Sequence, residues 1–175
     1  MYRLAKLAVL LLFVSCGALS VRYDYDKNTN FSNYNTYNYY PEMDTGMNDF
    51  DTKRLLQVLD AKMREKGMLL SEEPDFYINI KSTVFQAPQN NAVGVGLGGA
   101  GRNVGGGVSV GIPVSGNKLQ REIQFDFVDN QKDALFWQAI SVANFREKGT
   151  PTDKELELKE VVDKVLAKYP PKIRR

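Results

Sequence analysis

Residues 119–142, LQREIQFDFVDNQKDALFWQAISV, contain two apolar-rich runs joined by a short polar turn. In residues 119–127 apolar side chains alternate with polar ones, which is typical of a strand with one buried face. Its apolar side is formed by Leu119, Ile123, Phe125 and Phe127. Residues 129–133 favour a turn, and residues 134–142 return with Leu135, Phe136 and Trp137. The stretch therefore predicts a β-hairpin.

Three segments on the N-terminal side of this hairpin also have the character of strands. Residues 75–85 and 19–25 alternate in the same way, and each predicts a strand with one buried face. The side chains that share a face are Phe76, Ile78, Ile80 and Val84 in the former, and Leu19, Val21, Tyr23 and Tyr25 in the latter. A shorter run, residues 36–40, follows a turn region rich in Asn and Tyr and predicts an edge strand that ends before Pro41.

Two segments have the apolar period of amphipathic helices. Residues 48–66 begin with Asn48, a favourable N-cap, and stop at Gly67. Residues 150–169 begin with Thr150 and Pro151, with Asp153 placed to complete a cap. Two helices with one apolar stripe each, together with several half-buried strands, predict an α+β fold in which an antiparallel β-sheet carries both α-helices on one face.

Glycine is concentrated between two of the predicted strands. Ten of the 14 Gly residues lie within residues 93–116, which predicts a long Gly-rich loop. Three roles for this loop are open: a flap that orders on a partner, a segment that inserts Val and Leu into a membrane, or a connection without a function of its own.

The first sixteen residues have the anatomy of an export signal. A cationic start, an apolar run over residues 7–14 and the small residue Ser15 precede Cys16. This run is too short to span about 30 Å of hydrocarbon, and the order of its parts is that of a cleaved signal peptide, residues 1–15. A Cys directly after the small residue resembles the lipobox of bacterial lipoproteins, so Cys16 is the predicted lipid attachment site. The alternative is a cytosolic protein with an apolar N-terminal strand and a buried Cys.

This reading divides the chain into an anchor and one domain. Residues 16–18 would form the lipid anchor and a short tether, residues 19–171 a single α+β domain, and residues 172–175 a basic tail. Because the tether is so short, we expect the domain to rest close to the lipid headgroups.

Composition excludes several classes of function. Two of the 23 basic residues lie in the leader, so the remaining chain carries 21 basic and 21 acidic residues and lacks the basic surface that nucleic-acid binding requires. The chain has no His and a single Cys, which removes the commonest general base and metal ligand. We therefore predict no catalytic, cofactor-binding or metal-binding residues.

Four motifs in order resemble the DUF4136 family of bacterial envelope lipoproteins. They are Asp24 and Asp26 followed by FSNYNTY (31–37), KGM (66–68) followed by EPDFYI (73–78), DFVD (126–129) followed by LFWQA (135–139), and VLAKYPP (165–171). The resemblance runs from about Val21 to Pro171, with departures at Lys27 and Ala139. It implies an envelope lipoprotein of a Gram-negative bacterium, but no activity and no site residues, because the family is a domain of unknown function.

Two other motifs resemble a dinucleotide-binding site and a catalytic acid pair, but each has a simpler structural explanation. Residues 94–99, GVGLGG, match the dinucleotide fingerprint, but the Gly-rich residues that follow cannot open the helix that holds pyrophosphate. The acidic pair Glu72 and Glu73 could act on sugars, although adjacent acids before Pro74 are more simply a solvated turn.

The expected function is that of a non-catalytic structural or interaction component of the envelope. Acyl chains such as palmitate on Cys16 would hold it on the periplasmic face of the outer membrane, or alternatively on the cell surface. Its expected partners are the membrane and an envelope protein or peptidoglycan, bound through an exposed edge or face of the sheet. The alternative is a carboxylate-dependent hydrolase of envelope glycans, which would need two acids about 5–10 Å apart in a cleft.

Overall fold

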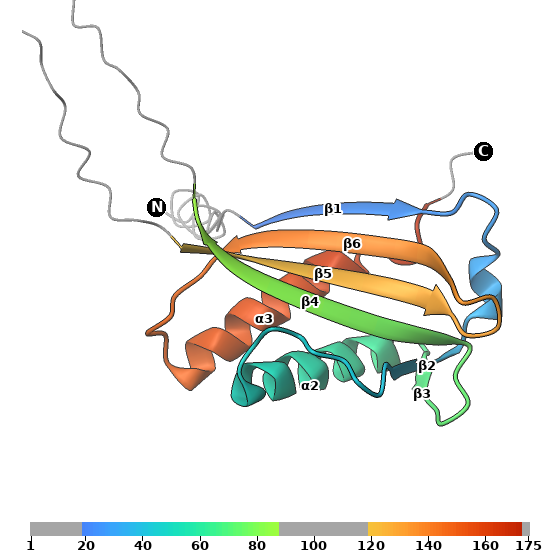
Figure 1. Ribbon diagram of the computed structural model, residues 1–175, viewed down its shortest axis with the longest axis horizontal. Helices are drawn as coiled ribbons and strands as arrows, with labels where there is room; N and C mark the ends of the chain where they lie inside the picture. The colour runs from blue at the N-terminus through green and yellow to red at the C-terminus, as the bar shows by residue number, and fades with distance from the viewer. Residues whose placement is uncertain (1–18, 88–118, 173–175) are drawn as a thin grey trace, which may run out of the picture.

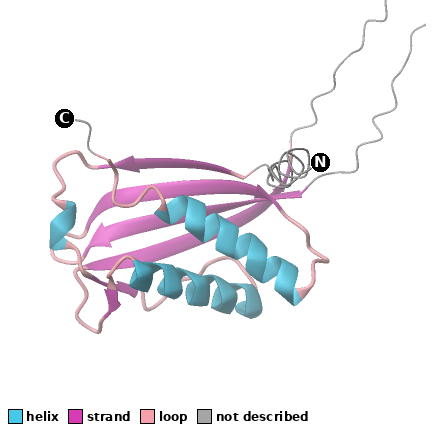
Figure 2. Ribbon diagram, turned by 180° about the vertical axis from the view of Figure 1, so that it is seen from behind, coloured by secondary structure: helices cyan, strands magenta, loops and turns pink. Residues whose placement is uncertain are grey.

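A computed structural model of the protein describes residues 19–87 and 119–172, which form a six-stranded sheet with two helices on one face (Figures 1 and 2). Across the sheet the strands follow the order β1-β6-β5-β4-β2-β3. Their bounds are β1 Ser20–Tyr25, β2 Thr36–Tyr39, β3 Leu69–Leu70, β4 Phe76–Gln86, β5 Leu119–Asp129 and β6 Ala134–Asn144. The predicted α+β class is confirmed.

The predicted hairpin is present and forms the centre of the sheet. β5 pairs antiparallel with β6, β6 with β1, and β4 with β5. The register shifts after Phe127, which lies opposite Trp137, while Val128 lies opposite Leu135. This bulge turns two consecutive side chains, Phe136 and Trp137, into the core. Strict alternation would have exposed one of them.

The prediction of an antiparallel sheet was wrong, because the sheet is mixed. β2 runs parallel to both β3 and β4. It also lies between these two strands, so the prediction that residues 36–40 form an edge strand was wrong too. The chain leaves β2, passes through a helix and returns to β4, and such a crossover brings the chain back in the same direction.

Both helices begin as their sequences predict. α2 (Asp49–Glu65) is capped by Asn48, whose side-chain oxygen accepts a hydrogen bond from the Asp51 N–H. α3 (Pro151–Leu166) begins with a capping box, in which Thr150 and Asp153 each accept a hydrogen bond from the other's backbone N–H. Figure 2 shows both helices on the same face of the sheet, as expected. A short 3₁₀ turn, η2 (Phe31–Asn33), follows β1.

The core is aromatic at its centre, where the apolar faces of the sheet and of the two helices meet. Trp137, Phe127 and Tyr169 are buried with ring centroids 4.6–5.2 Å apart. Two residues predicted on buried strand faces, Tyr23 and Val84, are each 42% exposed. Each lies on a stretch of strand that has no described strand on its outer side.

Several predictions concern residues outside the described ranges. These are the signal peptide, the tether, the Gly-rich loop over residues 93–116 and nearly all of the basic tail. Within residues 19–87 and 119–172, no helix has the length and apolar character needed to cross a bilayer.

Candidate functional site

The face of the sheet turned away from the two helices is left open by the part of the chain that the structure describes (Figures 1 and 2). A row of polar side chains crosses four strands on this face. Asn79 of β4 lies opposite Asp126 of β5, Asp126 lies opposite Gln138 of β6, and Gln138 lies opposite Asp24 of β1. These positions alternate along the strands with core residues such as Ile78 and Phe127. Their side chains therefore point to the face opposite the buried one.

Asp126 is a carboxylate of this row that accepts three side-chain hydrogen bonds. Gln138 Nε2 donates a hydrogen bond to Asp126 Oδ1 at 2.7 Å, and Gln124 Nε2 donates to both carboxylate oxygens at 2.8 and 3.0 Å. An ionised carboxylate offers about four acceptor positions. These amides therefore hold the group in place and leave it able to accept from a ligand.

A loop after β2 forms a raised rim beside the open face. The Tyr40 N–H donates to Ile78 O at 3.3 Å, and the Ser82 N–H donates to Thr45 O at 2.8 Å, so the loop is fixed at two points along β4. The Tyr40 ring lies 5.2 Å from the ring of Tyr77 on that strand. Burial, followed by the charge of Asp133, raises the pKa of Tyr40. Its phenol, like that of an ordinary tyrosine, is a hydrogen-bond donor at neutral pH.

Loop and sheet together border an open surface hollow of about 730 Å³. Its lining combines an aromatic and aliphatic part with amide, ammonium and carboxylate groups. The lining residues are Tyr40, Pro41, Glu42, Met43, Asp44, Asn79, Lys81, Asp126, Val128 and Leu135. Leu135 is 50% exposed, an apolar side chain available at a polar surface. Such a mixture suits a ligand that carries both apolar faces and hydrogen-bonding groups.

Gly46 allows the rim to approach the sheet, and replacing it tests this role. Its φ is +67°, and a Cβ there would lie 2.6 Å from the backbone oxygen of Ser82. Gly46→Ala should therefore lower the free energy of unfolding by more than the ~1–2 kcal/mol of left-handed strain alone, because the loop must also move away from β4. The free energy would be measured by urea denaturation.

Gly67→Ala is the matched control. Gly67 has φ +81° but nothing within 4 Å of the added Cβ. This variant should show the strain cost alone, about 1–2 kcal/mol. Equal losses in the two variants would contradict a close contact between rim and strand.

The aromatic residues before the rim have a structural role. The Tyr37 and Tyr39 hydroxyls both donate to Asp60 Oδ1 of α2, at 2.8 and 2.6 Å. The Tyr34 hydroxyl donates to Asp129 Oδ2 at 2.7 Å. Burial, and next the hydrogen bonds to these carboxylates, raises the pKa of all three phenols. These contacts tie β2 and the segment before it to the rest of the domain.

The structure separates the acids weighed in the sequence from the hollow. Glu72 and Glu73 are exposed in the connection between β3 and β4 and do not line it. Cys16 lies outside the described residues. Among the described residues, no group of three or more His, Cys, Asp or Glu side chains could hold a metal ion. The sequence showed the polar alternation of β5, but it did not show that the loop of residues 40–46 lies along β4, the strand next to β5.

The sequence model of DUF4136, described as a domain of unknown function, matches residues 21–171. No curated protein sequence matches the chain.

Two solved structures share the fold. A PDZ domain protein from Parabacteroides distasonis ATCC 8503 has a TM-score of 0.59 at 11% identity, over 89% of this chain and 37% of that one. The PelC dodecamer from Paraburkholderia phytofirmans has a TM-score of 0.50 at 7% identity, over 89% of this chain and 99% of that one. This chain thus spans 37% of the length of the PDZ domain protein. At these identities the likeness concerns the fold alone.

Proposed function

We propose that this chain, which belongs to the DUF4136 family of unknown function, is a non-catalytic docking component of the bacterial envelope. Two parts of the chain would have separate roles, membrane anchoring and ligand binding. Cys16 would hold the protein on the membrane, and the hollow on the open sheet face would bind an envelope component.

The anchoring part rests on the N-terminal sequence. A cationic start, a short apolar run and Ser15 directly before Cys16 are the features of a lipoprotein signal. Gly17 and Ala18 carry no acid, and an acid just after the lipidated Cys is the usual mark of retention at the inner membrane or of surface export. We therefore assign the protein to the periplasmic face of the outer membrane, with the cell surface as the alternative.

The docking part rests on one observation, the mixed lining of the hollow. Tyr40 and Leu135 offer apolar surface on which a sugar ring can pack, while Asn79 and Asp126 can bond its hydroxyls. Lys81 adds an ammonium that can pair with a carboxylate. Peptidoglycan carries sugar rings, hydroxyls and the carboxylates of its peptide stems, which are the counterparts of these five side chains.

Cosedimentation with purified peptidoglycan sacculi tests this assignment. Lys81→Ala and Asp126→Ala should each lower the association constant for sacculi at least about tenfold, because a hydrogen bond to a charged group contributes about 1.5–3 kcal/mol. Lys164→Ala is the control, since this lysine pairs with Glu160 on the helical face and lies away from the hollow. Equal binding by all four proteins would show that the hollow is not the peptidoglycan site.

One observation favours the alternative of a glycan hydrolase. Glu42, Asp44 and Asp126 place three carboxylates around the same hollow, and glycoside hydrolases use a pair of such groups. The same incubation separates the two functions when the supernatant is analysed for soluble muropeptides by mass spectrometry. A docking protein releases none. Release that is lost in Asp126→Asn would favour the hydrolase.

A further inference from the structure

One end of the domain gathers segments that are distant in the sequence (Figure 1). Ser20, the first residue of β1, lies opposite Val142, and the same row continues through Glu122 to Thr83 near the end of β4. Arg121, in the next row, pairs with Asp51 in the first turn of α2. The start of β1, the end of β4 and the start of α2 therefore lie at the same end.

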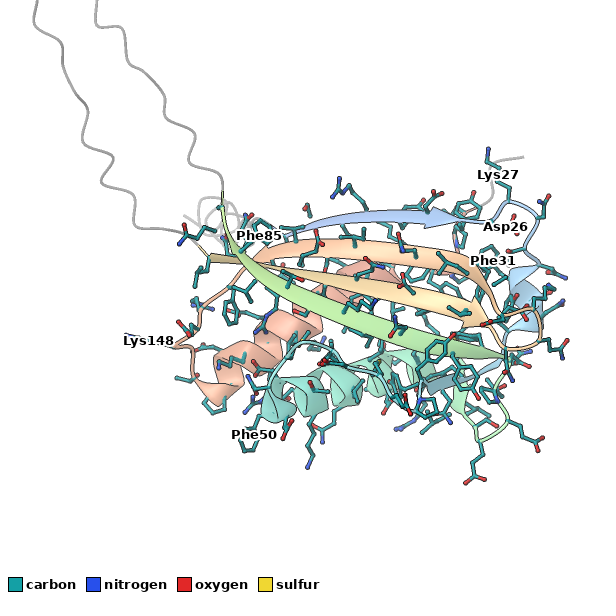
Figure 3. All side chains as sticks on the ribbon, in the orientation of Figure 1. Asp26, Lys27, Phe31, Phe50, Phe85 and Lys148 are labelled. Carbon is teal, nitrogen blue, oxygen red and sulfur yellow. The ribbon has the colours of Figure 1, made fainter. Side chains whose placement is uncertain are left out.

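This end carries exposed apolar side chains. Phe50, in the first turn of α2, is 74% exposed, the highest fraction among the described large apolar residues. Leu156 in α3 is 59% exposed and Val84 in β4 is 42% exposed. Figure 3 shows Phe50, Phe85 and Lys148 at this end, whereas Asp26, Lys27 and Phe31 lie at the opposite one. Exposed apolar residues also occur at the opposite end, where Leu69 and Leu70 of β3 are 62% and 58% exposed. Exposure alone therefore does not single out the Phe50 end, and its distance from the proposed anchor decides.

The chain length before β1 brings this end close to the proposed anchor. Only residues 17–19 separate Cys16 from Ser20, and a fully extended chain of four steps spans at most about 14 Å. The strands β4, β5 and β6 each have 11 residues, so the opposite end is about 33 Å further away along the strands. An acylated Cys16 therefore keeps the Phe50 end within reach of the bilayer.

We propose that this end is a membrane-docking surface, on which Phe50 inserts among the headgroups of the phospholipid bilayer that holds the acyl chains. This inference rests on the proposed acylation of Cys16. Aromatic rings are favoured at the boundary between headgroups and hydrocarbon. The exposed Lys148 lies at this end, and the exposed Lys53 is three residues after Phe50 in α2, within one helical turn. Their long side chains can keep their charges in water while the stems lie on lipid. The domain then stands with its sheet upright on the membrane.

A fluorescent label on a single thiol tests the orientation. Acylation converts Cys16, the one Cys of the chain, to a thioether, so a Cys introduced by Phe50→Cys or Lys27→Cys is the sole free thiol. The acylated mature protein, residues 16–175, would be placed in phosphatidylethanolamine–phosphatidylglycerol vesicles and labelled with a polarity-sensitive dye. We expect a blue shift at position 50 and quenching by nitroxide-bearing lipids, with neither effect at position 27.

The outcomes separate this inference from the anchoring it assumes. A purified protein whose mass shows no acyl chains overturns both. An acylated protein whose label at position 50 emits as in water overturns the docking surface alone. Quenching at position 27 but not at position 50 would show that the domain lies along the β1 edge, which also overturns it.

Discussion

Replacing Cys16 with serine should move the protein from the membrane fraction to the soluble fraction. The thioether at this Cys is the proposed attachment of the acyl chains, and a serine cannot form it. Each buried CH₂ contributes about 0.8 kcal/mol to membrane binding, and stable anchoring requires more than one chain. Losing every chain therefore removes far more binding energy than Phe50 and its neighbours could supply. Ultracentrifugation of lysed cells followed by immunoblotting would measure the distribution.

A second variant tests whether anchoring requires a Cys at position 16 or only a Cys somewhere near the N-terminus. Cys16→Ser combined with Ser20→Cys keeps one Cys in the chain but places it four residues after the lipobox. We expect this protein to be as soluble as the single variant. A Cys16→Ser protein that remains in the membrane fraction would contradict lipid anchoring at this residue.

Asp51→Ala should lower the free energy of unfolding by about 3–5 kcal/mol, the usual cost of removing one member of a buried ion pair. The Asp51 side chain is 1% exposed and bonds Arg54 at 2.9 Å, while Arg121 Nη2 lies 3.6 Å from its other oxygen. Burial lowers the pKa of Arg121, and the Asp51 charge opposes that effect. Without Asp51, the Arg121 guanidinium would remain buried against Phe145, 3.9 Å from the ring centroid, without this counter-charge.

Two comparisons test the cause of this loss. Asp163→Ala removes an ion pair with Lys62 and Lys159 whose carboxylate is 36% exposed, and it should cost about 1 kcal/mol or less. Asp51→Ala combined with Arg121→Met should be more stable than Asp51→Ala alone, because the uncompensated charge is gone. Guanidinium denaturation gives all the values. If adding Arg121→Met brings no recovery, the loss has another cause, such as a cavity at position 51.

The position of Asp51 in a helix could be predicted from the local sequence, but its burial could not. From the sequence, Asp51 is an acid in the first turn of a helix capped by Asn48, and both features are present. Its burial is not visible in that pattern, because it depends on Arg121, 70 positions further along the chain. Arg121 occupies an inward position of β5, where the alternation predicts an apolar residue. A charge at such a position shows its role only when its partner is known.

The pairing of β2 is another feature that the local sequence does not predict. Its sequence predicts a strand, and a strand is present. Which neighbour it joins, and in which direction, depends on the helix-containing crossover to β4 and on hydrogen bonds to residues about 40 positions away. The hollow depends on the same pairing, because the loop that forms its rim runs directly from β2 along β4. Lys81, Asn79 and Asp126 could be predicted as outward residues, but not as parts of one site.

The sequence alone determined the class of the fold, the positions of both helices and their caps, the central hairpin and most of the side chains that form the core. These features follow from periodicity and from contacts between residues a few positions apart, which a linear pattern records directly. Tertiary structure alone decided the parallel direction of β2, the bulge that buries both Phe136 and Trp137, the pairing of Asp51 with Arg121 and the hollow beside residues 40–46. Each of these depends on which distant segments become neighbours, and that choice minimises the free energy of the whole chain rather than of any one segment.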